Sequence, residues 1–306
     1  MVKPRRLVPG DRVGIVAPAS PFDHETFNRG IGEVERLGLR PVLTDGVFAR
    51  RGYLAGDAKS RAAALTTVWR DHSLAAAMGA RGGYGSAQLL SHLDQADPSR
   101  HRQAFIGHSD LTALLVFLTT HCGLVCFHGP LVVNFAEGAA AYDRDSFVRC
   151  LMREGPVGEL TGDGVVPVRV GEAEGPLLGG TLTQLVASLG TPYAFSPPNG
   201  YVLLLEDVGE RPYRLDRMLT QLVSSGLLAR AVAVVCGECP GCDEPGGGPT
   251  ARGVVADVLE AFPGPILFGF PSGHTTGPAL TVPLGTVCRV VTGAQPGVVI
   301  TEAAVT

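Results

Sequence analysis

The chain has 306 residues, which is enough for two α/β domains or one large unit with a substantial core. Hydrophobic residues make up 45% of the sequence and charged residues 18%, a balance that excludes a disordered chain. With 25 basic against 29 acidic residues and a net charge of -4, the sequence lacks the basic patch of a protein that binds nucleic acid or an anionic membrane, and a small molecule or peptide is the expected ligand.

The sequence predicts a cytoplasmic protein. The apolar run 13–19 follows Asp11 and Arg12 and contains Pro18, so it lacks the hydrophobic region of an export signal. Nowhere do roughly 18 apolar residues follow one another, the length that a membrane-spanning helix needs. Seven cysteines form an odd set in a long chain, which fits reduced thiols better than a disulfide framework.

Short apolar strands alternate with amphipathic helices in the first half of the chain. We predict three βα units, which cover residues 12–17 with 27–37, 74–78 with 87–93, and 104–106 with 111–118. Asp23 is the expected N-cap of the first helix. Successive βα units predict a parallel sheet with helices on both faces, and ligands bind such sheets beyond the carboxyl ends of the strands.

We expect two domains. Residues 1–153 are predicted to form a doubly wound parallel-sheet domain of the flavodoxin-like or class I amidotransferase-like type. Polar sequence rich in Gly, Pro and Val over 154–176 predicts a linker with short extended pieces. Residues 177–306 are predicted to form a smaller α/β domain with a mixed sheet, with a helical stretch from 177 to 189, a strand over 201–205, a helix over 215–226 and strands over 231–235 and 266–270.

Ser109 stands where a predicted strand turns directly into a helix. That geometry raises a hydroxyl above the sheet and directs the first helical N–H groups at the group it attacks. The surrounding sequence, residues 107–111, reads Gly-His-Ser-Asp-Leu and departs from the G-x-S-x-G pattern of hydrolases. A Ser-Asp pair before an apolar run is also typical of a helix N-cap, so the motif alone leaves both roles open.

The glycine-rich loop 81–85, Arg-Gly-Gly-Tyr-Gly, is a second candidate. Its backbone N–H groups could approach a phosphate or form half of an oxyanion hole. The loop is neither a Walker A motif nor a G-x-G-x-x-G fingerprint in the first βα turn, which disfavours nucleotide binding. A tight turn with close packing is the alternative interpretation.

Three carboxylates, Glu206, Asp207 and Glu210, follow a strand that we expect to be buried on both faces. A carboxylate there can orient a histidine, or it can cap the next helix, a role that suits Asp207 or Glu210. His274 lies in a loop after the apolar strand 266–270 and is the histidine we favour. His108 and His128, near the same site, are kept as further candidates.

Three cysteines, Cys236, Cys239 and Cys242, are spaced as ligands of zinc or an iron–sulfur cluster would be. A closed site needs a fourth ligand, and the sequence offers no second C-x-x-C and no H-x-x-H. We therefore favour free thiols in a loop over a metal site.

Taken together, these segments resemble the LD-carboxypeptidase family of serine peptidases, which also includes the microcin-immunity hydrolases. The likeness extends over nearly the whole chain. It rests on the ordered blocks 7–13, 17–20, 52–56, 80–85, 106–112, 128–130, 178–180 and 205–210, on Tyr213-Arg214 and Asp216-Arg217, and on the late Gly-His block at Gly273-His274.

The resemblance implies a catalytic triad. Ser109 matches the nucleophile, His274 the general base and Glu206 the carboxylate that orients it, while the backbone N–H groups of Gly83 and Asp110 match the oxyanion hole. Ser109 belongs to the first predicted domain and the other two triad members to the second. We therefore expect the site in a cleft between the domains.

The implied activity is that of a cytoplasmic LD-carboxypeptidase that removes the terminal D-alanine from muropeptide tetrapeptides in cell-wall recycling. Members of the family are often homodimers, and the resemblance implies no cofactor. Two alternatives stay open: a microcin-immunity hydrolase that cleaves a peptidyl or aminoacyl nucleotide antibiotic, and a catalytically silent relative that binds peptides.

Two residues depart from the family pattern. His108 stands where the family usually has Tyr or Phe, and we expect its ring to fill the same space or to bind substrate. Thr181 stands where Asn or Cys is common, and we expect it to alter a contact in the cleft without touching the triad.

Overall fold

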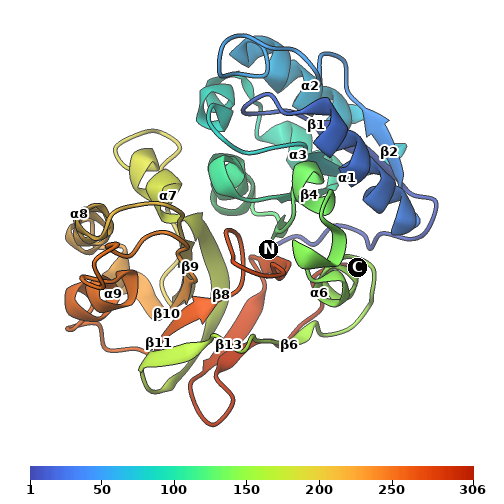
Figure 1. The fold of residues 1–306 in the computed structure, drawn as a ribbon. Helices are drawn as coiled ribbons and strands as arrows, with labels where there is room; N and C mark the ends of the chain where they lie inside the picture. The colour runs from blue at the N-terminus through green and yellow to red at the C-terminus, as the bar shows by residue number, and fades with distance from the viewer.

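The computed structural model describes residues 1–306, apart from the side chain of His101. The chain builds two sheets that lie beside each other. One comes from the blue and green part of Figure 1 together with one strand from near the end of the chain, and the other comes from the yellow-green to red part. The two termini lie close together, where backbone hydrogen bonds join Arg6 to Thr306 and Thr306 to Pro4. No helix in the described part of the chain has the length and apolar character needed to cross a membrane.

The N-terminal sheet has six strands in the order β12-β5-β4-β3-β1-β2. Five of them run parallel, and β12, which comes from near the end of the chain, pairs antiparallel with β5. The strands are β1 (Arg12–Val16), β2 (Arg40–Leu43), β3 (Leu74–Gly79), β4 (Ala104–Gly107), β5 (Cys126–His128) and β12 (Val282–Leu284).

Helical segments connect the parallel strands, as the βα pattern predicts. They are α1 (His24–Arg36), α2 (Ala58–Arg70), the 3-10 segment η1 (Ser86–His92), α3 (Ala96–His101), and the continuous run η2 (Ser109–Leu111), α4 (Thr112–Val116) and η3 (Phe117–His121). The predicted cap of α1 is confirmed: Asp23 accepts a hydrogen bond from the N–H of Thr26 at 2.8 Å. Phe27 and Val34 are buried on the inner face of that helix.

The C-terminal sheet has eight strands in the order β6-β14-β13-β8-β9-β10-β11-β7. Its centre, β8-β9-β10-β11, is parallel, and the remaining pairings are antiparallel, so the predicted mixed sheet is confirmed. The strands are β6 (Gly158–Leu160), β7 (Val166–Arg169), β8 (Glu172–Thr181), β9 (Tyr201–Glu206), β10 (Ala231–Gly237), β11 (Ile266–Phe270), β13 (Val287–Val291) and β14 (Gly297–Ile300).

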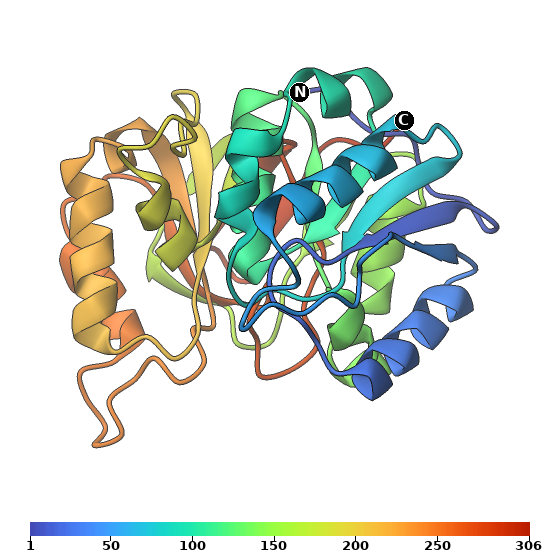
Figure 2. The ribbon, with the colours of Figure 1, turned by 90° about the horizontal axis from the view of Figure 1, so that it is seen from above.

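Helices α7 (Leu182–Ser188), α8 (Pro212–Ser224) and α9 (Ala251–Val258) cover the outer face of the C-terminal sheet, and α8 and α9 lie side by side in both ribbon views (Figures 1 and 2). The shorter helical segments are α5 (Val132–Phe135), η4 (Gly138–Ala140), α6 (Arg144–Leu151) and η5 (Leu228–Arg230).

Strand β9 shows how the two halves share a core. Val202 and Leu204 pack into the hydrophobic cluster that continues into the N-terminal sheet. Leu203 and Leu205 point the other way, into the cluster under α7, α8 and α9. Because both faces of the strand are buried, its end is carried into the interior together with Glu206.

One expected element is wrong in part. The helical stretch predicted from residue 177 begins only at Leu182, because residues 177–181 form the end of β8, in register with β9. Apolar residues before a helix suit a buried parallel strand equally well, and periodicity does not distinguish the two over such a short run. Strands β6 and β7 and the start of β8 fall within the predicted linker 154–176.

The carboxyl ends of strands from both sheets converge on one region. Gly107 at the end of β4 is in register with His128 at the end of β5, and Thr181 at the end of β8 is in register with Glu206 at the end of β9. The loop that carries His274 follows β11. This convergence brings the predicted site residues together from both halves of the chain.

Candidate active site

Ser109 occupies a sharp turn between β4 and the helical run that follows. Its φ of 62° lies in the left-handed region, which a residue with a side chain rarely adopts. The N-cap position belongs to His108, whose side chain makes no cap hydrogen bond. The N-cap interpretation of Ser109 is therefore wrong, and the strained turn agrees with the nucleophile interpretation.

The glycine-rich loop 81–85 is held between Ser109 and the loop that follows β1. The N–H of Ser20 donates to the carbonyl of Gly82 at 3.2 Å, and the hydroxyl of Ser20 accepts the N–H of Tyr84 at 3.1 Å. A Cβ on Gly82 would lie 2.9 Å from Cβ and 3.0 Å from Oγ of Ser109. Only glycine fits this approach, so the loop passes directly against the predicted nucleophile.

Gly83 and Asp110, the two expected oxyanion-hole residues, lie next to this contact. Gly83 has a φ of 100° and directly follows the glycine that touches Ser109. Asp110 lies in the first turn of η2, where backbone N–H groups have no partner within the helix. The side chain of Asp110 accepts hydrogen bonds from the N–H of Ser86 at 2.8 Å and from the side-chain amide of Gln184 at 3.2 Å.

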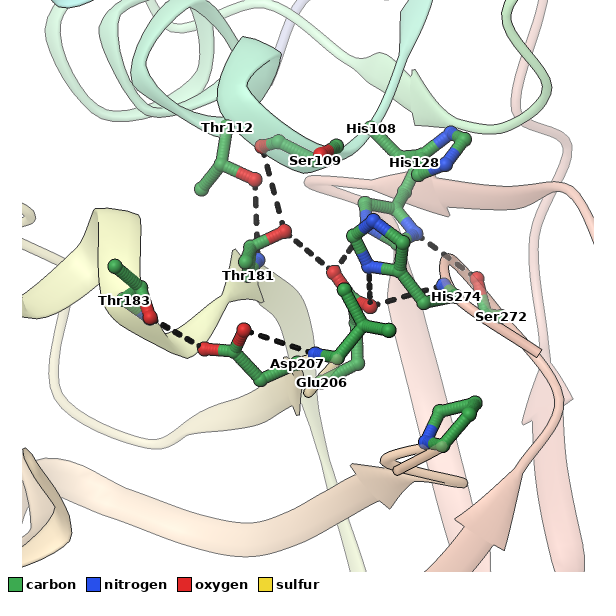
Figure 3. Close-up of polar contacts among 12 residues, drawn as sticks. His108, Ser109, Thr112, His128, Thr181, Thr183, Glu206, Asp207, Ser272 and His274 are labelled. Carbon is green, nitrogen blue, oxygen red and sulfur yellow. Dashed lines mark hydrogen bonds and ion pairs between the residues drawn. The ribbon is translucent and has the colours of Figure 1, made fainter. Parts of the chain in front are cut away.

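Glu206 and His274 are joined by a close polar contact (Figure 3). Oε2 of Glu206 lies 2.7 Å from Nδ1 of His274 and accepts the backbone N–H of the same residue at 2.9 Å. Glu206 is fully buried, whereas 22% of the His274 side chain is exposed. The histidine ring thus reaches from a buried carboxylate towards the surface.

The charges of this pair stabilise each other. Burial raises the pKa of Glu206, but its contacts with His128 and His274 outweigh that effect and hold the pKa well below its usual range. Burial lowers the pKa of His274, but the hydrogen bond and the charge of Glu206 outweigh it and raise the pKa above its usual value. A carboxylate that supports a histidine in this way can stabilise an imidazolium.

Thr181 touches the predicted triad, contrary to expectation. Its hydroxyl donates to Oε1 of Glu206 and also lies 3.3 Å from the carbonyl oxygen of Ser109. The register of β8 against β9 explains the contact, because it sets Thr181 beside Glu206 at the ends of neighbouring strands. Thr181 therefore joins the turn that holds Ser109 to the carboxylate behind His274.

Two further histidines lie in the same cluster. His108, which follows β4, is buried, and its ring centroid lies 5.3 Å from that of His274 and 5.9 Å from that of His128. Its Nδ1 lies 2.9 Å from the carbonyl oxygen of Gly129, so Nδ1 carries a proton and donates it. Burial and the two neighbouring histidines lower the pKa of His108 to about 3, which keeps the ring neutral.

Neither Asp207 nor Glu210 caps α8, whose N-terminus has no side-chain cap. Asp207 accepts the N–H of Thr183 at 2.9 Å and its hydroxyl at 2.7 Å, and so supports the first turn of α7. Glu210 accepts a hydrogen bond from Arg214 at 3.4 Å. The carboxylate of Asp207 therefore supports the start of α7, whereas the sequence predicted that one of these carboxylates would cap α8.

A pocket of about 290 Å³ opens beside His274. Its walls include His108, Asn134 and Glu137 from the N-terminal half and Pro240 and His274 from the C-terminal half. The two halves thus form this pocket together, and it is large enough for part of a small peptide.

The three spaced cysteines are buried free thiols at the end of β10 and in the loop after it. The N–H of Cys242 donates to the carbonyl of Cys239 at 3.2 Å and closes a turn between them. No set of three or more His, Cys, Asp or Glu side chains in the described part of the chain is arranged to hold a metal ion.

The sequence alone did not assign the roles of His128, Thr181 and Ser272. Ser272 is also buried and lies two residues before His274, in a stretch of sequence that does not mark it as functional. The sequence offers His128 only as a further candidate, and it predicts that Thr181 alters a contact in the cleft without touching the triad. The sequence signal that points to these residues is their position, because each of them ends a strand or follows one at the carboxyl edge of a sheet.

Two sequence profiles match the chain. The profile of the LD-carboxypeptidase N-terminal domain matches residues 13–129, and that of the LD-carboxypeptidase C-terminal domain matches residues 174–290. The first match contains Ser109, and the second contains Glu206 and His274.

Two relatives align over most of the chain. A Bacillus subtilis protein named a probable murein peptide carboxypeptidase is 32% identical over an alignment of 314 positions, which covers 97% of this chain and 94% of the relative. The murein tetrapeptide carboxypeptidase of Pseudomonas aeruginosa is 33% identical over 274 residues, which cover 86% of this chain and 88% of the relative.

The fold is also that of a solved protein. The structure of the microcin C7 self-immunity protein MccF in complex with aspartyl sulfamoyl adenosine superimposes with a TM-score of 0.93 and covers 100% of both chains. The two sequences are 24% identical, so this likeness concerns the fold, and it agrees with the α/β architecture predicted from the sequence.

Proposed function

Because this chain belongs to the LD-carboxypeptidase family, we propose that it is a serine-type hydrolase that cleaves the L,D peptide bond before the terminal D-alanine of a muropeptide tetrapeptide. The Pseudomonas aeruginosa relative, a murein tetrapeptide carboxypeptidase, supports this substrate class. The same proposal includes a role in cell-wall recycling, a cytoplasmic location and a homodimeric assembly.

The observation that carries the proposal is the Glu206–His274 contact of 2.7 Å in a site that also contains Ser109 in a strained turn. An ionised carboxylate can only accept hydrogen bonds, so Nδ1 of His274 carries the proton. Nε2 on the far side of the ring is then free to accept a proton from a hydroxyl. This is the tautomer that a general base for a serine nucleophile requires.

In the proposed mechanism, Nε2 of His274 takes the proton of Ser109 while Oγ attacks the scissile carbonyl carbon. Glu206 stabilises the imidazolium that forms, and the N–H groups of Gly83 and Asp110 donate to the oxyanion. The imidazolium then protonates the leaving nitrogen of D-alanine, which leaves an acyl-enzyme on Ser109. A water molecule, deprotonated by His274, attacks this ester and frees the tripeptide. No step requires a metal or an organic cofactor.

A direct test is incubation of the purified protein with a synthetic tetrapeptide that ends in an L-residue followed by D-Ala, with free D-alanine measured by mass spectrometry. A matched peptide that ends in L-Ala controls for stereochemistry. Release of D-alanine from the first peptide alone supports the proposal. An active preparation that releases L-alanine equally well contradicts the L,D specificity.

The second candidate is a microcin-immunity hydrolase, and the MccF complex with aspartyl sulfamoyl adenosine is the observation that favours it. Both candidates would use the same three residues, so the substrate distinguishes them. The same assay with aspartyl sulfamoyl adenosine measures release of aspartate. Cleavage of that compound without cleavage of the tetrapeptide would assign the chain to the antibiotic substrate.

A serine-reactive phosphonate probe separates both candidates from a silent peptide-binding relative. An enzyme of either kind is labelled at Ser109. A relative that binds peptide tightly but is neither labelled nor active would contradict both candidate activities.

A further inference from the structure

His128 contacts both elements on which the proposed base depends. It ends β5, is completely buried, and its Nδ1 lies 2.9 Å from Oγ of Ser272, two residues before His274 (Figure 3). Its Nε2 lies 3.8 Å from Oε1 of Glu206, the carboxylate oxygen that His274 does not use. Within the described part of the chain, this Nε2 has no hydrogen-bond partner.

The surroundings of His128 determine where its proton sits. The single hydroxyl proton of Ser272 can go to Nδ1 of His128 or to the carbonyl oxygen of Leu280 at 3.2 Å. If it goes to Nδ1, the neutral ring must carry its proton on Nε2.

If instead Ser272 donates to Leu280, then Nδ1 of His128 donates to Ser272, and Nε2 is either bare or protonated. A bare Nε2 would set a lone pair against a buried carboxylate, which is unfavourable where water is absent. Both acceptable arrangements therefore have a proton on Nε2 that faces Glu206.

We propose that His128 is a positioning residue of the reaction, which holds Oε1 of Glu206 through a proton on Nε2 and so keeps Oε2 turned to His274. The inference rests on the proposed triad. A separation of 3.8 Å is too long for a good hydrogen bond, so the attraction is mainly electrostatic, and burial strengthens it. His128 itself does not touch the reacting atoms.

The position of His128 in the fold fits this role. Its strand belongs to the N-terminal sheet and pairs with β4 and β12, whereas Glu206 and Ser272 belong to the C-terminal half. One buried side chain thus links the strand that precedes Ser109, the triad carboxylate and the loop of the base. A shift between the halves would disturb all three together.

Loss of His128 should change the basicity of His274. The proton on Nε2 offsets part of the negative charge of Glu206, so without it the carboxylate attracts the proton of His274 more strongly. The pKa of His274 then rises further above its usual value. The other titratable groups around His274 are His108 from the end of β4, Asp207 from the end of β9 and Cys242 from the loop after β10, and the substitution leaves them in place.

The kinetic test compares His128→Leu with His128→Gln, whose amide N–H can replace the N–H at Nε2. In His128→Leu we expect kcat to fall by about 10-fold to 100-fold, KM to change little, and the acidic limb of kcat/KM to move up by about one pH unit. His128→Gln should recover part of both effects. If His128 only filled space, its substitution would lower the amount of folded protein without moving the acidic limb of the pH profile of kcat/KM. An unchanged acidic limb in the folded variants would therefore overturn the proposal.

A second measurement depends on neither activity nor the Leu variant. Long-range proton–nitrogen NMR spectra of the histidine rings report which nitrogen is protonated, and comparison with His128→Gln assigns the signals of His128. A protonated Nε2 at neutral pH is expected, and a bare Nε2 would overturn the inference. If Nε2 is protonated but the protein cleaves no tetrapeptide, the buried arrangement around His128 is supported and the proposed function is contradicted.

Discussion

Nδ1 of His274 and the backbone N–H of the same residue both lie within 3 Å of a single oxygen, Oε2 of Glu206, at 2.7 and 2.9 Å. One carboxylate oxygen thus fixes the ring of the histidine and also the loop that carries it. Adding a Cβ to Gly273 or Gly237 would bring it within 2.5 Å of Glu206 side-chain atoms, so both glycines are needed for the carboxylate to fit. The base is oriented by close packing as well as by charge.

The first prediction uses two neighbouring carboxylates as a matched pair. Glu206→Gln removes the charge behind His274, and we expect kcat to fall by roughly 10³-fold or more, since the imidazolium loses its stabilising partner. Asp207→Asn changes the next residue, which bonds Thr183 at the start of α7, and should lower stability by about 1 kcal/mol with little effect on kcat. Steady-state kinetics and urea unfolding of both variants test this. Equal kcat losses would contradict the role of Glu206.

The second prediction concerns the pH dependence of the reaction. General base catalysis needs neutral His274, so kcat/KM should fall as the pH drops through the pKa of that residue. Glu206 raises this pKa above the usual 6.5 despite burial, so the acidic limb should lie above pH 6.5. Measurement of kcat/KM from about pH 5 to 9 checks the sign. A limb well below pH 6.5 would mean that the carboxylate does not act on the base as the geometry indicates.

The third prediction separates the chemistry of Ser109 from its backbone strain. Ser109→Ala and Ser109→Gly should both abolish turnover and labelling by a phosphonate probe. Their stabilities should differ, because glycine relieves the left-handed φ of 62° and alanine does not. We expect the Gly variant to be at least as stable as the Ala variant, by up to about 1 kcal/mol in thermal or urea unfolding. A Gly variant that is clearly less stable would show that the turn is not strained.

Much of the fold followed from apolar periodicity. The βα units around residues 12–37 and 104–118 and the strand ending at Glu206 lie where the sequence indicated, because a buried parallel strand and an amphipathic helix leave clear patterns. The periodicity could not reveal that β12 returns to the edge of the N-terminal sheet. The three residues of β12 do not indicate which strand they pair with, because such a pairing depends on the whole topology.

The predicted site residues were found from sequence motifs, whereas the residues that support them could not be found in that way. Ser109, Glu206 and His274 stand in distinctive local sequence, whereas Thr181 and Ser272 are common small polar residues whose roles arise only from contacts across the chain. The contact of Thr181 with Glu206 depends on the register of β8 against β9. A register of this kind is set by packing on both faces of the sheet, which one sequence does not specify.

The fourth prediction tests the packing of the glycine-rich loop on the nucleophile. Gly82 has an ordinary φ, so Gly82→Ala strains no backbone, but its methyl group would press on Cβ and Oγ of Ser109. We expect kcat/KM to fall by about 10-fold to 100-fold, since small displacements of a nucleophile are costly. Gly246→Ala is the control, because a Cβ there meets no atom within 4 Å. If both variants retain full activity, the loop does not hold Ser109 in place.

The fifth prediction concerns stability in acid. Burial and the nearby His274 and His128 lower the pKa of His108 to about 3, whereas in the unfolded chain the pKa is about 6.5. Between these pH values the unfolded state binds a proton that the folded state does not, so stability falls as the pH falls below about 6.5.

His108→Phe removes this proton uptake and keeps an aromatic ring. Between pH 7 and pH 5 the wild-type free energy of unfolding should therefore drop by on the order of 2 kcal/mol more than that of the variant. Urea unfolding at several pH values measures both slopes, and the loss of the hydrogen bond to Gly129 cancels because it is the same at each pH. Parallel slopes would show that His108 titrates normally in the folded protein.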